Sequence, residues 1–455
     1  MASEWQTTSL GELIEVKHGF AFPGQFIHEE PKGDILLTPG NFAIGGGFKG
    51  DKFKYYDGPV PEDFILRSGD LLVSMTDLSK QSDTLGLPAF VPARSDGRRY
   101  LHNQRLGKVL VKDTTTADPR FLHYLLCSQS YRNEVLASAT GTTVKHTSPD
   151  RIRRFRFSRP SLTEQRAIAN ILGALDDKIE LNRRMNETLE AMARALFKSW
   201  FVDFDPVRAK AHGRDPGLPQ PLADLFPDSF EDSELGEIPE GWRASVLGEE
   251  VTRCGGRIQT GPFGSQLHAS DYVDDGIPVV MPKDLLQRRV STLSIARVRL
   301  SDAERLSRHR LQEGDIVYSR RGDVEQHGLV RSRETGWLCG TGCLLVRLGP
   351  GWPSPLFASI ALDRPETRAW IVQHAIGATM PNLNTGILTR VPILVPPNKV
   401  LDAFNRIVQP LADRVIAGDA QTDTLVSLRD SLLPKLISGE LRVKHAERTI
   451  ARAGA

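Results

Sequence analysis

Cysteine, histidine and arginine are the residues of this chain that could do chemistry, and their spacing favours binding over catalysis. Cys339 and Cys343 flank a Gly-Thr-Gly turn. A structural zinc site needs four ligands, and neither Cys254 nor His327 has a supporting spacing, so we expect buried thiols and no metal. The histidines stand among arginines without a paired nucleophile, which favours contact with phosphates or bases over acid–base catalysis.

Sequence motifs of catalysis are missing as well. The stretch GGGFKGDK at Gly45 lacks the Gly-Lys-Ser/Thr ending of a phosphate-binding loop and does not lead from a clear strand into a helix. The Asn/Asp-Pro-Pro-aromatic tetrapeptide of adenine methyltransferases is also missing, since VPPN at Val395 has the wrong residues and order. The sequence therefore predicts a chain that is not itself an enzyme.

Composition indicates a folded chain of two or three domains, with 455 residues, of which 40% are hydrophobic and 25% charged. The start has no signal-peptide pattern and no run approaches the ~20 apolar residues of a membrane span, so we expect a cytoplasmic location, no membrane and reduced cysteines. The net charge is only +2, but eleven arginines lie between Gln287 and Glu334, and a second basic cluster, KHTSPDRIRRFRFSR, begins at Lys145. Such clusters favour a polyanion partner, the alternative being a solvated charged surface.

An internal repeat must position these residues. GTTVKHTSPDRIRRFRFSRPSLTEQRAI from Gly141 aligns without a gap with GATMPNLNTGILTRVPILVPPNKVLDAF from Gly377. Upstream, LGELIEV matches LGEEVTR, and RSGDLLVS matches QEGDIVYS, in the same order. The chain is therefore predicted to be two copies of one unit, each a mixed α+β domain followed by a long helix.

Both long helices carry apolar residues at heptad spacing, which is typical of a coiled-coil seam. Polar or small residues interrupt both seams near the middle, and only an antiparallel pairing lets the two middles meet. We therefore predict an intramolecular antiparallel pair whose register is marked by Asn182, Asn186, Gly418 and Thr422. The alternative is that each helix packs only on its own domain.

These features resemble those of the specificity (S) subunits of type I restriction-modification enzymes. The most specific stretches are SLTEQRAIANILGALDDKIELNRRMNETLEAMARALFKSWFVDFDPVRAK, LFPDSFEDSELGEIPEGW and TLVSLRDSLLPKLISGEL, and the resemblance covers essentially the whole chain. It implies that two target-recognition domains each read half of a split double-stranded DNA site. It also implies two methyltransferase subunits docked on this chain and two restriction (motor-nuclease) subunits, for adenine methylation and DNA cleavage. S-adenosylmethionine, ATP and magnesium are then expected on these partners, with no cofactor on this chain.

The expected fold is α+β, with two similar recognition domains separated by two long helices that form an antiparallel coiled coil with a pseudo-two-fold axis. The predicted boundaries are 1–160 (recognition domain 1), 161–204 (helix 1), 205–241 (linker), 242–396 (recognition domain 2), 397–438 (helix 2) and 439–455 (C-terminal tail, its end frayed). A helix of about 38 residues is roughly 57 Å long and exceeds one DNA turn of roughly 34–36 Å. The pair is therefore predicted to fix the length of the unread DNA spacer.

Two loops in each copy carry donors suited to reading bases, since arginine pairs bidentately with guanine and asparagine or glutamine with adenine. The first loop is SMTDLSKQSD in one copy and SRRGDVEQHG in the other, and the second is GTTVKHTS and GATMPNLN. The base-reading candidates are Thr76, Lys80, Gln81, Lys145, His146, Arg320, Arg321, Gln326, His327, Asn382 and Asn384. The DNA-backbone candidates are Arg151, Arg153, Arg154, Arg288 and Arg289. For each residue the alternative is a phosphate contact or a capped turn.

Two other functions stay open. A stand-alone two-domain DNA-binding regulator would bind its site tightly without partners. Its basic helix residues would then be ordinary surface and not a docking face; they are Arg166, Lys178, Arg183, Arg184 and Arg194. An enzyme with a divergent nuclease site would need a clustered Asp/Glu/Lys set, which the sequence lacks.

Overall fold

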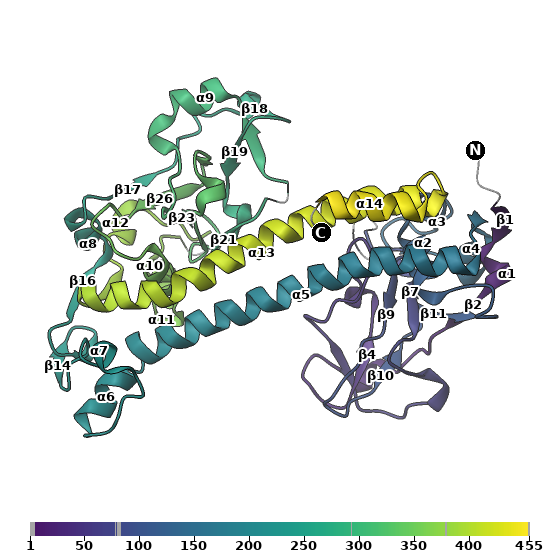
Figure 1. The fold of residues 1–455 in the computed structure, drawn as a ribbon, viewed down its shortest axis with the longest axis horizontal. Coiled ribbons are helices and arrows are strands. Elements are labelled where there is room, and N and C mark those ends of the chain that lie inside the picture. Colours follow the sequence, from purple (N-terminus) through teal and green to yellow (C-terminus); the bar gives the residue numbers. More distant parts are fainter. Residues whose placement is uncertain (1–4, 78, 80–82, 293, 378–379, 454–455) are drawn as a thin grey trace. The chain divides into compact units, whose positions relative to one another are not determined.

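The computed structural model describes residues 5–77, 79, 83–292, 294–377 and 380–453. The chain divides into two compact units: unit 1 comprises Met1–Arg184 and Gly418–Ala455, and unit 2 comprises Met185–Ala417. Each unit combines a domain of strands and short helices with one stretch of each long helix, α5 (Leu162–Phe201) and α13 (Asn398–Ser438) (Figure 1).

The mixed domain of unit 1 contains two main sheets, with strand orders β2-β11-β7-β9 and β3-β5-β4-β10-β6. Its strands are β1 (Gln6–Ser9), β2 (Ile14–His18), β3 (Ile27–His28), β4 (Asp34–Leu37), β5 (Lys54–Tyr56), β6 (Ile65–Leu66), β7 (Leu71–Ser74), β8 (Thr76–Asp77), β9 (Pro88–Phe90), β10 (Tyr100–His102), β11 (Leu106–Val111), β12 (Lys145–His146) and β13 (Arg156–Arg159). Its short helices are α1 (Leu10–Leu13), α2 (Pro119–Cys127), α3 (Gln129–Ala137) and α4 (Pro149–Arg154). Buried side chains of β2, β7, α2, α5 and α13 form one core, which joins the domain to the helix pair.

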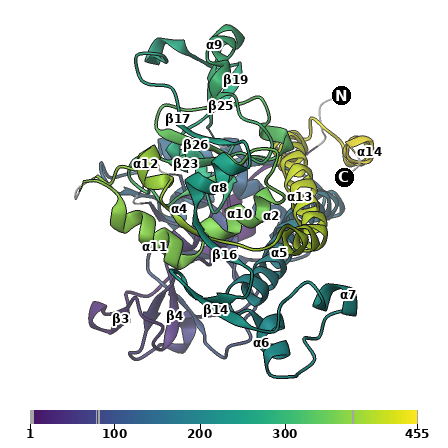
Figure 2. The same cartoon turned by 90° about the vertical axis from the view of Figure 1, so that its left-hand side faces the viewer.

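The mixed domain of unit 2 has sheets of order β17-β26-β23-β24 and β18-β22-β19-β25. Its strands are β14 (Phe230–Ser233), β15 (Gly236–Pro239), β16 (Arg243–Val246), β17 (Arg257–Thr260), β18 (Tyr272–Val273), β19 (Ile277–Val280), β20 (Leu285–Leu286), β21 (Arg289–Val290), β22 (Ala296–Val298), β23 (Ile316–Ser319), β24 (His327–Leu329), β25 (Leu338–Cys339), β26 (Cys343–Arg347) and β27 (Pro392–Val395). Its short helices are α6 (Asp205–Ala211), α7 (Gln220–Ala223), α8 (Leu247–Arg253), α9 (Leu300–Arg305), α10 (Pro355–Leu362), α11 (Pro365–His374) and α12 (Thr385–Leu388). Figure 2 shows α8, α10 and α12 around β23 and β26, with which they share a core.

The same connections recur in the two units, which confirms the predicted repeat and the α+β class. Strand β1 pairs antiparallel with β13 in unit 1, and β16 pairs with β27 in the same way in unit 2. Each domain contains a parallel strand pair, β4 with β10 in unit 1 and β19 with β25 in unit 2. Helices α2 and α10 both begin with proline after a side-chain cap, Asp118 in one unit and Ser354 in the other.

Within unit 1 the two long helices are antiparallel, as predicted. Asp176 of α5 binds Arg429 of α13, whereas Asn182, further along α5, binds Gln421, which is earlier in α13. Helix α5 begins with a capping box. The Ser161 hydroxyl accepts a hydrogen bond from the backbone N–H of Glu164, and the backbone N–H of Ser161 donates to the Glu164 carboxylate.

Within unit 2 the remaining stretches of α5 and α13 are also antiparallel. Asn186 donates to the carbonyl of Val415, and further along α5 the ring of Phe197 lies 6.2 Å from that of Phe404. The segment predicted as a linker forms α6, α7 and the hairpin β14-β15, and its Phe226 is buried in the same aromatic core.

The C-terminal end differs from the frayed tail that we predicted. It forms helix α14 (Val443–Ala453), whose Ala446 is buried in the core of unit 1. Glu164 joins the two chain ends there, because its carboxylate accepts hydrogen bonds from the Trp5 indole at 3.1 Å and from Arg442 at 2.8 Å. In the described part of the chain, no helix has the length and hydropathy that crossing a bilayer requires.

Candidate nucleic-acid interface

The two donor-bearing loops of the first copy lie side by side in unit 1. Strand β8 pairs antiparallel with β12, so that Thr76 lies opposite His146 and Asp77 opposite Lys145. The Thr76 hydroxyl and Nδ1 of His146 are 3.2 Å apart in a hydrogen bond. Segments about 70 residues apart in the sequence are thus brought together by main-chain pairing.

Asp77 fixes the base of the first loop. It is 2% exposed, and its carboxylate accepts hydrogen bonds from the backbone of Ser79 and of Thr84, each at 2.6 Å. Burial alone would raise the pKa of Asp77, but these hydrogen bonds outweigh it and lower the pKa. The carboxylate therefore stays ionised and holds both ends of the loop. The candidates Lys80 and Gln81 lie outside the described residues.

Unit 2 repeats this arrangement with different side chains. Arg321 and Asn382 form an isolated antiparallel bridge, and the backbone N–H of Leu383 donates to the carbonyl of Arg320 at 2.9 Å. The two bridged residues correspond to Thr76 and His146 in the repeat. The same backbone scaffold therefore presents a different set of donors in each unit.

Four of the candidates combine this scaffold with solvent access. His146 and Arg321 are exposed, and Lys145 and Asn382 are half-buried. We call these four residues the paired-loop face, two of them in each unit. Because their side chains differ between the units, the paired-loop faces suit two different base sequences. Their contact with bases stays a prediction, as does that of the half-buried Gln326.

The structure contradicts a base-reading role for His327 and Thr76. His327 is 1% exposed, its Nε2 lies 3.1 Å from the carbonyl of Ser359, and its ring stacks on Tyr318. Burial lowers the pKa of His327 to about 3, so the ring is neutral. Thr76 is 4% exposed. Both residues lie in strands, β24 and β8, whose pairing directs these side chains inward.

The structure gives Asn384 a capping role and leaves the base-reading role of Arg320 a prediction. The side chain of Asn384 accepts the backbone N–H of Ile387 at 2.8 Å and caps α12, as Ser148 caps α4 in unit 1. For Asn384 the capped-turn alternative therefore describes the structure. Arg320 is half-buried, and its Nε is among the buried atoms that have no hydrogen-bond partner within the described residues.

Arg288 and Arg289, which we predicted to contact the DNA backbone, are occupied by ion pairs inside unit 2. Arg288 is 10% exposed at its side chain and lies 3.4 Å from the carboxylate of Asp363. Arg289 donates from Nε to Glu190 of α5 at 3.0 Å. Both guanidinium groups are held by carboxylates inside unit 2, so neither is available to a phosphate in this conformation.

The remaining backbone candidates lie on the short helix α4, directly after the second loop. Arg151 donates to the hydroxyl of Thr140 at 3.1 Å, and Arg153 lies 3.6 Å from Asp150. Arg154 is exposed. Three arginines beside the paired-loop face suit contact with phosphates, and this role stays a prediction.

The polar residues of the helix seam meet near the positions that we inferred. Asn182, 1% exposed, donates to Gln421 at 3.0 Å and lies 3.5 Å from the Thr422 hydroxyl. Asn186, 4% exposed, donates to the carbonyl of Val415 at 3.4 Å. Gly418 is buried in the seam. Buried amides that must find partners favour one register over its neighbours.

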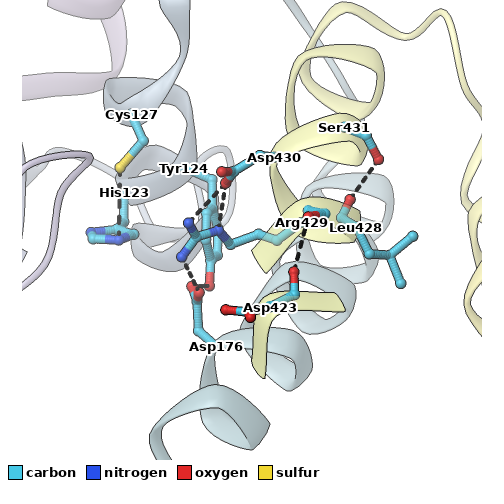
Figure 3. A network of polar contacts seen from close by, with 10 residues as sticks. His123, Tyr124, Cys127, Asp176, Asp423, Leu428, Arg429, Asp430 and Ser431 are labelled. Carbon is cyan, nitrogen blue, oxygen red and sulfur yellow. Dashed lines mark hydrogen bonds and ion pairs between the residues drawn. The ribbon is translucent and has the colours of Figure 1, made fainter. Parts of the chain in front are cut away.

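A polar network that we did not predict attaches the recognition domain of unit 1 to the helix pair (Figure 3). Asp176 of α5 accepts hydrogen bonds from the Tyr124 hydroxyl at 2.7 Å and from Arg429 at 2.9 Å. Burial and the Asp176 carboxylate raise the pKa of Tyr124. Burial alone would lower the pKa of Arg429, but Asp176 and Asp430 outweigh it and raise the pKa. Both donors therefore stay protonated at neutral pH. The only signal in the sequence was a charged residue, Arg429, at a seam position.

The cysteines offer neither a metal site nor a reactive thiol. Burial raises the pKa of Cys339 and of Cys127 to about 12, and raises that of Cys343 as well. Within the described ranges, no group of three or more His, Cys, Asp or Glu residues is arranged to hold a metal ion.

Comparison with known proteins points to one family. Residues 2–191 match the model of the type I restriction modification DNA specificity domain. The chain is 28% identical over 369 residues to the HindI specificity subunit of Haemophilus influenzae, covering 71% of this chain and 77% of that protein. It is 22% identical over 448 residues to the EcoBI specificity subunit of Escherichia coli, covering 96% and 86%. The chain resembles the type I restriction specificity subunits. A solved S subunit from M. genitalium shares its fold, with a TM-score of 0.59 and 17% identity over 95% of this chain and 96% of that one.

This resemblance gives the structural features of the chain a common interpretation. The family model covers the first recognition domain and part of α5. The second copy repeats the strand pairings of the first, so that unit 2 carries a second domain of the same design. The paired-loop faces carry different side chains at corresponding positions of these two domains.

Proposed function

We propose that this chain is the subunit that gives a type I restriction-modification complex its DNA sequence specificity, and that it catalyses no reaction itself. Each recognition domain reads one half of a split, asymmetric site in double-stranded DNA. The observation that carries this proposal is the repeated backbone pairing of two loops that presents His146 and Lys145 in one unit and Arg321 and Asn382 in the other. One scaffold with two sets of donors is what two unequal half-sites require.

The long helices have two roles in this proposal. A helix of 40 residues, such as α5, rises about 60 Å, which exceeds one DNA turn of roughly 34–36 Å, so the pair sets the length of the unread spacer. The helices also dock two methyltransferase subunits. Support comes from two large apolar side chains of α5 that are exposed to solvent, as is typical of a docking surface: Leu181 is 56% exposed and Met192 53%.

The partners supply all the chemistry. The methyltransferase subunits bind S-adenosylmethionine and methylate adenine, and two restriction subunits use ATP and magnesium to translocate and cleave DNA. The specificity subunit contributes the choice of site to both reactions. Its buried thiols fit this division of labour, because burial raises the pKa of a thiol such as Cys339 and a protonated thiol is a poor nucleophile at neutral pH.

The test is co-expression of the chain with its cognate methyltransferase subunit in a host free of other adenine methylation, followed by mapping of methylated adenines. We expect a split motif with two unequal halves and a fixed spacer. A continuous motif, or no methylation with a methyltransferase subunit proven active with another specificity subunit, would contradict the proposal. Tight specific binding by the chain alone would favour the stand-alone regulator.

A further inference from the structure

A strained hairpin in unit 2 carries Arg288 in its turn and Arg289 at the start of its second strand. Strands β20 and β21 are joined by a two-residue turn, with Leu286 opposite Arg289. The central residues Gln287 and Arg288 have φ values of +47° and +64°. Turns of this kind usually contain Asn-Gly, because a residue with a Cβ rarely adopts positive φ. We infer that contacts made by the side chains of the hairpin offset the strained backbone of the Gln287-Arg288 turn.

The turn places both arginines on neighbouring parts of unit 2. Arg288 is buried against Asp363, which follows α10, and its carbonyl accepts the backbone N–H of Leu329 at 3.0 Å. Arg289 reaches α5, where both Nε and a terminal nitrogen donate to Oε1 of Glu190. The Arg289 and Glu190 side chains are 29% and 22% exposed, so water screens this contact only partly. The hairpin thereby ties the recognition domain to the long helix.

Apolar packing beside this contact is incomplete. A cavity of about 120 Å³ lies between α5, α13 and α10, bordered by the two arginines and Glu190. Its apolar wall includes Ala193, Ile360 and Ala412. A cavity gives no close contacts to fix an angle between elements, so the ion pair at its border contributes more to the geometry than it would beside a filled core.

The repeat makes the contrast with unit 1 explicit. The offset that places Gly141 on Gly377 places Tyr124 on Ile360 and Asp176 on Ala412, and Arg429 corresponds to Ala193 in the other direction. The three small or apolar residues of the cavity wall thus stand where unit 1 has its polar network. The two recognition domains are attached to the helix pair by different chemistry.

We propose that Arg289 and Glu190 are positioning residues, which hold the second recognition domain at the angle on α5 that sets the DNA spacer. The inference rests on the proposed function. It requires that loss of the ion pair loosens the spacer requirement while the bases read by the paired-loop face stay the same. One base pair more or less moves a half-site by about 3.4 Å and turns it by roughly 35°, which a loosened attachment can accommodate.

The experiment uses the complex of the full chain with its methyltransferase subunits. Initial methylation rates are measured on DNA duplexes with the cognate spacer and with spacers one base pair shorter and longer. The variants are Arg289→Ala, Glu190→Gln and the charge swap Arg289→Glu with Glu190→Arg. The control is Arg364→Ala, whose side chain is 31% exposed and pairs with Glu366, two residues further along the chain, so that the attachment to α5 is untouched.

We expect Arg289→Ala and Glu190→Gln to reduce the preference for the cognate spacer by roughly tenfold, which corresponds to about 1.4 kcal/mol. The charge swap should recover part of the preference, and Arg364→Ala should match the wild type. If Arg289→Ala and Glu190→Gln, folded by circular dichroism, keep the spacer profile of Arg364→Ala, the positioning role is wrong. A wild-type complex that methylates no split site would overturn the proposed function as well, so the two failures are distinguishable.

Discussion

Removing Arg429 should weaken unit 1 by an amount that depends on Asp176. The Arg429 and Asp176 side chains are 31% and 35% exposed and their contact is 2.9 Å long. Exposed ion pairs contribute about 0–1 kcal/mol, whereas removing one partner of a buried pair costs about 3–5 kcal/mol. A contact about one third exposed lies between these limits, and we expect Arg429→Ala to lower the free energy of unfolding of unit 1 by about 1–2 kcal/mol.

The measurement is differential scanning calorimetry of the full chain, read on the transition that Arg429→Ala and Tyr124→Phe both shift. For a unit of about 150–250 residues, 1 kcal/mol shifts Tm by roughly 2–4 °C, so Arg429→Ala should lower this Tm by about 2–8 °C. Tyr124→Phe should cost about 1.5 kcal/mol, because its 2.7 Å hydrogen bond to a carboxylate is lost while the ring stays.

A double-mutant cycle separates the contact from other effects. In the Asp176→Asn background, Arg429→Ala should cost about 1 kcal/mol less than in the wild type. Asp430→Ala is the matched control, because it removes the other carboxylate that pairs with Arg429. The Asp430 side chain is 59% exposed, so this change should shift Tm by less than about 2 °C. If Arg429→Ala lowers the free energy of unfolding equally in both backgrounds, the contact between Arg429 and Asp176 does not stabilise unit 1.

Three further predictions concern pH, the helix seam and base reading. Burial lowers the pKa of His102 to about 4, and the unfolded chain, at about 6.5, takes up the proton more readily; stability should therefore be constant above pH 6.5 and fall by up to about 3 kcal/mol toward pH 4. His102→Gln should flatten this slope in urea titrations of unit 1, and an unchanged slope would argue against it. The buried side-chain oxygen of Asn182 has no hydrogen-bond partner among the described residues, so Asn182→Leu should raise the free energy of unfolding by about 1 kcal/mol in calorimetry. A lower free energy of unfolding would contradict this prediction. Arg321→Ala should slow methylation about 10- to 100-fold and relax the specificity for one base pair of one half-site, whereas Arg154→Ala should weaken binding to all DNA sites equally. If both variants relax specificity, the distinction between base and phosphate contacts is wrong.

The sequence predicted those parts of the fold that depend on local spacing or on comparison of the chain with itself. The heptad positions Ile168, Leu172 and Leu175 are all buried, and the antiparallel direction followed from the polar residues in the two seams. The repeat also located the loops of the paired-loop face. These predictions succeed because helix periodicity and repeats are properties of the sequence alone.

Other features could not be predicted, because they depend on contacts between distant residues. Arg289 is 99 residues from Glu190 in the chain, and the Gln-Arg turn that brings them together lacks the usual Asn-Gly signature. His327 looked like a donor in a polar turn, but β24 continues the sheet and buries it. Arg429 was visible as a charged seam residue, yet its partner Asp176 could be named only once the register of the helices was known.

Replacement of residues 1–160 with the equivalent segment of another type I specificity subunit tests whether each domain reads its own half-site. The chimaera is co-expressed with the methyltransferase subunit and its methylated adenines are mapped genome-wide. We expect one half-site to change to that of the donor, while the other half-site and the spacer length stay as in the parent. A change in both half-sites, or an unchanged motif in an active complex, would contradict it.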